Sequence, residues 1–255
     1  METSKLILNW TEYYFTDDNT QANWIHKIML NGNTYNIKQY VWWWQPWADT
    51  VAYYKLEQDL NDYSWNNLNL TPASTVTYSS LASGKNVCFF NDSASISSFP
   101  ALTGDITVVL WVKNKSNYTW YNWVWYILKW NSWDDAGCTA LVFSWNSQSN
   151  GLRWQPTWSL ISRPTVFTDT NWHLIICTYN KNTQDSNVYL DGNTIPLINF
   201  TNTSSASPSA SVFYLCKYSS QKDTYLSDVI IESKVWTADE ISAHFNSTKS
   251  LYGIS

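Results

Sequence analysis

The chain has 255 residues, with 15 lysines and arginines against 20 aspartates and glutamates, so its formal net charge at neutral pH is -5. A nucleic-acid binder needs a basic surface to neutralise phosphates, and this acidic balance excludes nucleic acid as the expected partner. With 44% hydrophobic and 14% charged residues, the chain can bury a large core, which excludes disorder as its main state and fits one large β-sandwich or two small domains.

The N-terminus gives no sign of export. The segment METSKLILNWTEYY lacks the apolar core and the small-residue cleavage site of a signal peptide. No stretch of the sequence reaches the roughly 18 consecutive apolar residues that span a bilayer. We therefore expect neither a signal peptide nor a membrane span.

Residues 1–40 are predicted to form a small β domain for anchoring or assembly. They contain an internal repeat, LILNWTEYYF at residues 6–15 and IMLNGNTYNI at residues 28–37, which indicates two β-hairpins. A short helical piece is predicted at residues 16–28. Residues 41–50 are predicted to be a linker, and they include an aromatic run made of Trp42, Trp43, Trp44 and Trp47.

The content of 18 tryptophans beside only 7 glycines is unusual. An average domain has about 7% glycine, which is roughly 18 residues in a chain of this size. The repeat places Trp10 opposite Gly32, where a hairpin favours Asn-Gly. Other tryptophans in polar, turn-like surroundings are Trp65, Trp130, Trp133, Trp145, Trp154 and Trp158.

Two hypotheses account for these tryptophans. In the first, which the glycine deficit favours, several of them correspond to codons that the source organism translates as glycine through an alternative genetic code. In the second, they are real indoles selected for aromatic binding surfaces. By contrast, Trp111, Trp172 and Trp236 lie in apolar strand patterns and are predicted core residues.

From residue 51 to the end, short β-rich runs alternate with turn clusters. The runs are VAYYKL, VTYSSL, NVCFF, ITVVLWVK, WVWYILK, CTALVFS, LIICTYN, NVYLDG, SVFYLCK and LSDVIIESKVW. Many short strands with little helix predict an all-β, antiparallel two-sheet sandwich. One short helix is predicted at residues 237–247, because Thr237 and Glu240 have the spacing of a capping box.

A family resemblance follows from the order of these segments. The succession YYKLEQDLNDYSWNN, SGKNVCFFNDSASIS, ITVVLWVKN, NWHLIICTYN, NVYLDGNTI and LSDVIIESKVWTADEISAHFN resembles the laminin-G-like domains of the concanavalin A-like lectin/glucanase superfamily, over residues 51–253. The resemblance implies a jelly-roll sandwich of two curved antiparallel sheets. This chain departs from the family at Trp65, where the pattern has glycine.

Neither the cysteines nor the histidines indicate a metal or redox site. The cysteines lie in apolar, strand-like runs without CxxC spacing, and are predicted to be small buried side chains: Cys88, Cys138, Cys177 and Cys216. The histidines are far apart and lack metal-ligand spacing: His26, His173 and His244.

The superfamily resemblance raises two further possibilities for the chemistry of this protein, which are glycoside hydrolysis and calcium binding. Glu57, Asp59 and Asp62 form E-x-D-x-x-D, one carboxylate short of the E-x-D-x-x-E strand of the related β-glucanases, so a glycoside hydrolase is an alternative. Because laminin-G-like sandwiches often hold calcium, the resemblance implies Asp62 and Asp228 as metal ligands. The alternative for both aspartates is a turn-forming or capping role.

Sugar binding needs an aromatic platform with amide or carboxylate groups nearby. The loop at Asn66 and Asn67 has suitable polar groups, and SNYTWYNW supplies the aromatic side chains. The candidate ligand-binding residues are Asn66, Asn67, Tyr118, Trp120 and Tyr121, together with the acidic pair Asp134 and Asp135.

These features together favour a non-catalytic adhesion protein that recognises a glycan or a cell-surface polymer. The absence of an export signal favours a virion component, such as a phage fibre or decoration protein, located on a virion or an extracellular surface. We expect the N-terminal domain to form homo-oligomers or to contact virion proteins. The alternatives are a glucanase-type hydrolase and a bacterial cell-surface lectin-like protein.

Overall fold

The structure is a computed structural model, and it describes residues 4–8, 11–15, 26–30, 33–39, 48–114, 122–130, 139–145, 151–155, 161–162, 169–201, 212–217 and 224–255. The chain divides into two compact units, Met1–Gln45 and Pro46–Ser255. The aromatic run from Trp42 to Trp47 lies outside the described residues. An anchoring role for the first unit stays a prediction.

The first unit contains a four-stranded antiparallel sheet. Its strands are β1 Ser4–Leu8, β2 Thr11–Phe15, β3 His26–Leu30 and β4 Asn33–Gln39, in the order β1-β2-β4-β3. Leu8 pairs with Thr11 and Leu30 pairs with Asn33, so both halves of the repeat form tight hairpins as predicted. The helix predicted at residues 16–28 is wrong over its last three residues, since His26–Ile28 pair with β4 in a strand. Residues 16–25 lie outside the described residues.

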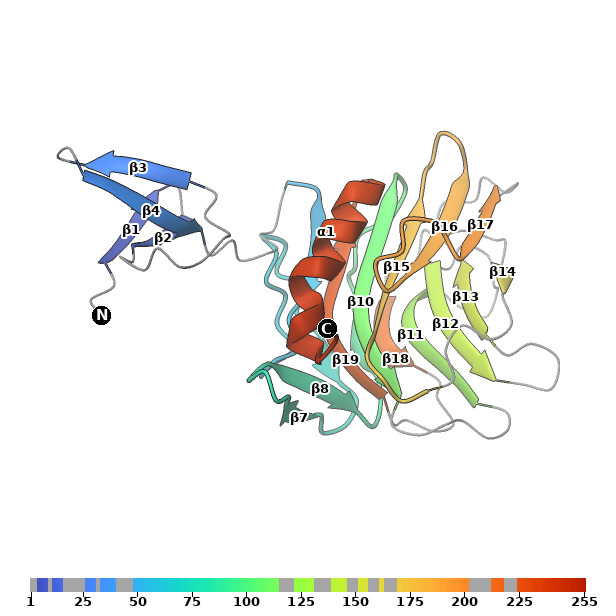
Figure 1. Cartoon of the computed structure of the whole chain (residues 1–255). Helices are drawn as coiled ribbons and strands as arrows, with labels where there is room; N and C mark the ends of the chain where they lie inside the picture. Colours follow the sequence, from blue (N-terminus) through green and yellow to red (C-terminus); the bar gives the residue numbers. More distant parts are fainter. Residues whose placement is uncertain are drawn as a thin grey trace. The chain divides into compact units, whose positions relative to one another are not determined.

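The second unit is a sandwich of two antiparallel sheets (Figure 1). The strands of the larger sheet are β5 Thr50–Tyr54, β7 Thr77–Ser80, β8 Asn86–Phe90, β10 Ile106–Asn114, β15 His173–Tyr179, β16 Asp185–Leu190, β17 Ile198–Thr201 and β19 Thr224–Glu232. They run in the order β17-β16-β15-β10-β19-β8-β7, with β5 also paired to β19. The predicted all-β sandwich is confirmed.

The second sheet of this unit has seven strands in the order β14-β13-β12-β11-β18-β9-β6. Their bounds are β6 Thr71–Pro72, β9 Ala94–Ile96, β11 Asn122–Trp130, β12 Thr139–Trp145, β13 Gly151–Gln155, β14 Ile161–Ser162 and β18 Val212–Lys217. The predicted strand LSDVIIESKVW is too long, because β19 ends at Glu232 and the chain then turns toward the helix.

Strand β10 explains why ITVVLWVK is almost continuously apolar. It lies between β15 and β19, and every residue except Lys113 is buried. Because side chains of a strand alternate between faces, Val108 and Leu110 enter the core between the sheets, whereas Val109 and Trp111 are buried outside that core. The strand therefore has apolar layers on both of its faces.

The outer layer is the C-terminal helix α1, Ala238–Thr248, with the 3₁₀ turn η1, Lys249–Tyr252, which Figure 1 shows in front of β10. The ring of Trp111 stacks on Tyr252 with centroids 4.0 Å apart and lies 6.0 Å from the ring of Phe245. Trp172 and Trp236 are buried in addition to Trp111, so the three predicted core tryptophans are confirmed. Among the helices of the described residues, none has the length and apolar character needed to cross a bilayer.

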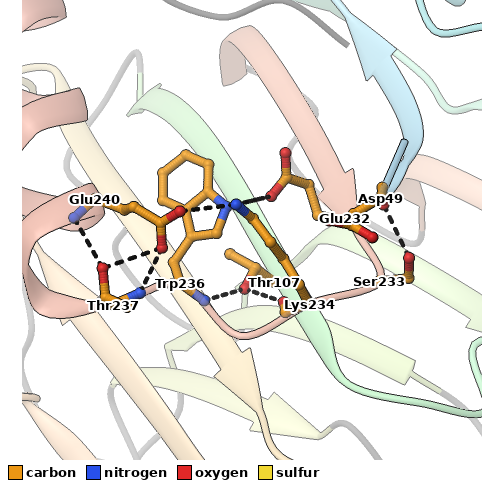
Figure 2. A network of polar contacts seen from close by, with 8 residues as sticks. All are labelled: Asp49, Thr107, Glu232, Ser233, Lys234, Trp236, Thr237 and Glu240. Carbon is orange, nitrogen blue, oxygen red and sulfur yellow. Dashed lines mark hydrogen bonds and ion pairs between the residues drawn. The ribbon is translucent and has the colours of Figure 1, made fainter. Parts of the chain in front are cut away.

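A polar network fixes the turn between β19 and α1 (Figure 2). The buried Glu232 carboxylate accepts a hydrogen bond from the indole of Trp236, whose backbone nitrogen donates to the Thr107 hydroxyl over 3.0 Å. The predicted capping box is present, because Thr237 and Glu240 accept hydrogen bonds from each other's backbone nitrogens. These contacts join the start of the helix to β10 and β19.

The core tests two predictions, which concern Trp154 and the cysteines. Trp154, predicted in a turn, lies in β13 and is fully buried, and its indole donates to the carbonyl of Thr178 over 3.2 Å. The turn prediction is wrong because pairing with β12 and burial outweigh the polar sequence around it. The predicted burial of the cysteines is confirmed for Cys88, Cys177 and Cys216, which are free thiols, while Cys138 lies outside the described residues.

Candidate functional site

The Trp65 loop, residues 61–69, leads from β5 toward β6 and is organised around the side chain of Asp62. One oxygen of Asp62, Oδ1, accepts hydrogen bonds from the backbone nitrogens of Tyr53 and Ser64, each over 2.9 Å. The other, Oδ2, accepts from the Ser64 hydroxyl over 2.7 Å and from the Leu68 nitrogen over 2.9 Å. Asp62 thus fixes both ends of the loop to β5, as turn-forming aspartates do.

Two asparagines add to this framework. The amide of Asn66 donates to the carbonyls of Thr50 and Val51, each over 3.0 Å. The Asn69 side chain accepts from the backbone nitrogen of Asp62 over 2.8 Å. Asn67 has a left-handed backbone with φ of 55°, which asparagine tolerates better than most residues. Side-chain contacts therefore hold the loop backbone in one conformation.

The loop presents an aromatic ring and an amide to solvent. Trp65 is 81% exposed, more than any other large hydrophobic side chain among the described residues. Asn67 is also exposed, and its side chain makes no hydrogen bond within the part of the chain that the structure describes. The face of an indole packs against apolar surfaces, and an amide both donates and accepts hydrogen bonds. A sugar ring offers both kinds of partner, since it has C–H faces and hydroxyl groups.

Asp228, the second predicted metal ligand, is connected to the loop through Tyr53. The Tyr53 hydroxyl donates to Asp228 over 3.3 Å, while its backbone nitrogen donates to Asp62. Asp228 also accepts from the Tyr252 hydroxyl over 2.7 Å and forms an ion pair of 2.9 Å with Lys85. In the sequence, only the family resemblance connects these two aspartates.

The Asp228 cluster has shifted pKa values with clear causes. Burial, followed by the Asp228 charge, raises the pKa of Tyr53 well above its ordinary value. For Lys85, burial alone would lower the pKa, but the charge of Asp228 and the hydrogen bond to Glu57 outweigh it and raise the pKa. Both shifts favour a protonated Lys85 and a neutral Tyr53 at neutral pH, so this is a stable structural cluster.

Calcium does not fit the contacts of these two aspartates. Calcium needs six to eight oxygen ligands, whereas both Asp62 oxygens already accept N–H or O–H donors and Asp228 is paired with a lysine. Within the described ranges, no group of three or more His, Cys, Asp or Glu side chains could hold a metal ion. We therefore expect that these two aspartates do not bind calcium.

The three carboxylates of E-x-D-x-x-D have separate partners. Glu57 pairs with Lys85 over 2.7 Å, and Asp59 accepts from Asn61 and from the Tyr63 hydroxyl. Asp62 accepts hydrogen bonds from the backbone of the Trp65 loop and of β5. Retaining glycoside cleavage instead needs two carboxyl groups that face one substrate bond, and none of the contacts of the described residues joins these three side chains as such a pair.

The remaining predicted ligand-binding residues lie outside the described residues: Tyr118, Trp120, Tyr121, Asp134 and Asp135. The structure brings Asn66 and Asn67 onto one loop with Asp62, and it adds Trp65. From the sequence, Trp65 is one of the tryptophans in turn-like surroundings and a departure from a family glycine, and it is not among the predicted ligand-binding residues. An aromatic residue directly before two asparagines, after a turn-forming aspartate, is the signal that could have identified it.

Comparisons with known proteins give the fold. No family model matches the sequence, and no curated protein matches it. Solved structures do match: the binding domain of Paraclostridial Mosquitocidal Protein 1 has 16% identity and a TM-score of 0.61, covering 81% of this chain and 55% of that one. The botulinum neurotoxin serotype D binding domain has 13% identity and a TM-score of 0.62, covering 78% and 51%.

A third structure, of botulinum neurotoxin type C, has 11% identity and a TM-score of 0.60, covering 78% of this chain and 51% of that one. The chain therefore spans about half the length of the binding domains it matches. At these identities the likeness concerns the fold, and this chain shares the β-sandwich architecture of those binding domains.

Proposed function

We propose that this protein is a non-catalytic binding protein that recognises a glycan or a surface polymer through the Trp65 loop. The observation that carries the proposal is the exposed pair Trp65 and Asn67 on a backbone that Asp62 holds in place. A loop fixed before binding loses little conformational entropy when a ligand arrives. A rigid aromatic side chain beside an adaptable amide is a common composition of binding surfaces.

The solved neighbours support a binding role. They include botulinum neurotoxin type C, whose cell entry depends on interaction with two ganglioside molecules, and a serotype D ligand-binding domain in complex with N-acetylneuraminic acid. Since this chain matches only about half of each neighbour, it need not contain their sugar sites. The neighbours therefore support only a general role for this chain, that of a β-sandwich that binds a target.

The finer parts of the proposal rest on sequence. The ordered motifs of residues 51–253 favour a laminin-G-like sandwich. Together with the small first unit, they favour a virion fibre or decoration protein on a virion or an extracellular surface. In this proposal, the four-stranded sheet mediates oligomers or contacts to virion proteins, and the second unit binds the target.

The test is binding of the full chain to a glycan array, compared with Trp65→Ala. We expect a loss of about 30-fold in affinity, because truncating an aromatic hot spot costs about 2 kcal/mol. The matched control is Ile195→Ala, which removes another exposed hydrophobic side chain, 74% exposed, and should leave binding unchanged. The free energy of unfolding of both variants should lie within about 0.5 kcal/mol of that of the parent, since neither side chain is buried. Full binding by Trp65→Ala would contradict the proposal.

A further inference from the structure

We infer that the Trp65 loop selects uncharged glycans and disfavours glycans that carry a carboxylate or sulfate beside the bound sugar. This inference rests on the proposed function and adds the ligand class. It follows from the charges of the loop and of the residues that flank it.

The first observation is the one-sided charge of the segment. Between residues 56 and 84 the chain has three acidic residues, Glu57, Asp59 and Asp62, and no lysine or arginine. Lys55 and Lys85 lie just outside this segment, and Lys85 pairs with Glu57, so an anionic ligand seated here meets the carboxylates of Asp59 and Asp62, which form no ion pair among the described residues. Like charges that face each other across an interface weaken binding and act against the wrong partner.

The second observation is that Asp62 carries a charge without a counter-ion. Three of its four hydrogen-bond donors are backbone N–H groups, which can only donate, and the fourth is the Ser64 hydroxyl. All four donors are uncharged, and no lysine or arginine of the described residues forms an ion pair with it. Asp62 is only 8% exposed, so water screens its charge less than it would at the surface.

Besides burial, which is the main cause, the negative charge of Asp62 contributes to the raised pKa of the neighbouring Tyr54 side chain. Tyr54 donates its hydroxyl proton to the carbonyl of Leu68, within the same loop, over 2.8 Å. Asp62 belongs to the loop that carries Trp65 and Asn67, which follow it by three and five positions in the chain.

Two lysines lie near the loop, and their contacts indicate how each would act on an anionic ligand. Lys85 forms ion pairs with both Glu57 and Asp228, so its single positive charge is already shared by two carboxylates. Lys55 has its Nζ 4.4 Å from the ring centroid of Tyr63, beside the loop. Lys55 is therefore the residue to remove when testing whether an anionic ligand is attracted.

The experiment uses the full chain and matched glycan pairs, each a neutral glycan and the same glycan with a terminal sialic acid or a sulfate. We expect the neutral member to bind about tenfold more tightly, a difference of about 1.4 kcal/mol. The difference should shrink between low and high ionic strength, because salt screens charge repulsion. Salt is used here because removing Asp62 itself would disturb the loop.

The outcomes separate the two proposals. Tighter binding of the neutral member that Trp65→Ala abolishes supports both. Tighter binding of the anionic member that depends on both Trp65 and Lys55 overturns the charge selection and leaves the proposed site in place. Binding that Trp65→Ala does not affect, or no binding to any glycan, overturns the proposed function and the ligand class with it.

Discussion

The carboxylate of Asp62 lies 2.9 Å from the backbone nitrogen of Leu68, six residues later, and this bond closes the loop that carries Trp65. Of the donors that Asp62 accepts, the Leu68 nitrogen is the one at the far end of the loop. The rigidity of the proposed binding surface therefore depends on one buried side chain rather than on regular secondary structure.

Asp62→Ala should lower the free energy of unfolding by about 2–4 kcal/mol, because it leaves three backbone N–H groups without their acceptor. Urea unfolding would measure this change, and binding should be lost with the loop conformation. The control is Asp59→Ala, whose partners Asn61 and Tyr63 are less buried. We expect it to cost about 0.5 kcal/mol. Equal costs for the two variants would contradict a special role for Asp62.

Gly192, in the turn between β16 and β17, packs against Phe245 of helix α1. It has φ of +71°, and a Cβ at this position would lie 2.5 Å from atoms of the Phe245 ring. Gly84 has a similar φ of +85° but no atom within 4 Å of such a Cβ. Gly84→Ala should therefore cost about 1 kcal/mol from backbone strain alone.

Gly192→Ala should cost more than about 3 kcal/mol, because the clash with Phe245 adds to the same backbone strain. Thermal unfolding of the pair separates the two effects. If both variants lose the same stability, then α1 does not pack on this turn as described.

His244 makes the stability of the second unit sensitive to acid. Burial lowers its pKa from the usual 6.5 to about 4, and the nearby charge of Asp228 opposes this shift only in part. A histidine with a lowered folded pKa stabilises the protein above its unfolded pKa, and that contribution is lost as the pH falls. We expect a loss of about 3 kcal/mol between pH 6.5 and pH 4.

The measurement is urea unfolding of the parent and of His244→Phe across this pH range, with the variant expected to show a smaller loss. His173 provides a contrast of opposite sign. Burial alone would lower its pKa, but hydrogen bonds to Asp191 and Asp169 raise it. Its contribution is present below the unfolded pKa and fades as the pH rises through the folded pKa. A pH profile of His244→Phe identical to that of the parent would contradict the burial of His244.

Calcium should leave the melting temperature of the protein unchanged. Asp62 uses its oxygens for the loop, and Asp228 is neutralised by Lys85. Bound ligand stabilises a folded protein in proportion to the logarithm of its concentration over Kd. Melting curves with excess calcium and with a chelator should therefore coincide. A higher melting temperature in calcium that Asp62→Asn removes would instead support the site implied by the family resemblance.

Features that follow from local sequence patterns could be predicted, whereas features that depend on contacts between distant residues could not. The strand β10 and the capping box of α1 follow from local patterns, and both are present. The strands β6 and β9 were not predicted, since they have two and three residues and depend on partners far away in the chain. The link from Tyr53 to Asp228 spans 175 residues, so only the folded sandwich reveals it.

The last prediction concerns the identity of the tryptophans. A glycine at Trp154 would leave a large cavity in the core and remove the hydrogen bond to Thr178, so we expect tryptophan there. The proposed function likewise requires tryptophan at Trp65. In contrast, Trp10 lies between the paired residues Leu8 and Thr11, the position that Gly32 has in the second hairpin, and fits the glycine hypothesis.

Peptide mass spectrometry of the natively produced protein, covering residues 1–67 and 120–160, distinguishes these positions. Tryptophan at Trp65 and Trp154 is the expected result, whatever is found at Trp10 and in the run from Trp42 to Trp47. Glycine at Trp65 would remove the indole and contradict the proposed contact. The inferred preference for uncharged glycans would then be lost as well, because that inference assumes that the glycan binds at this loop.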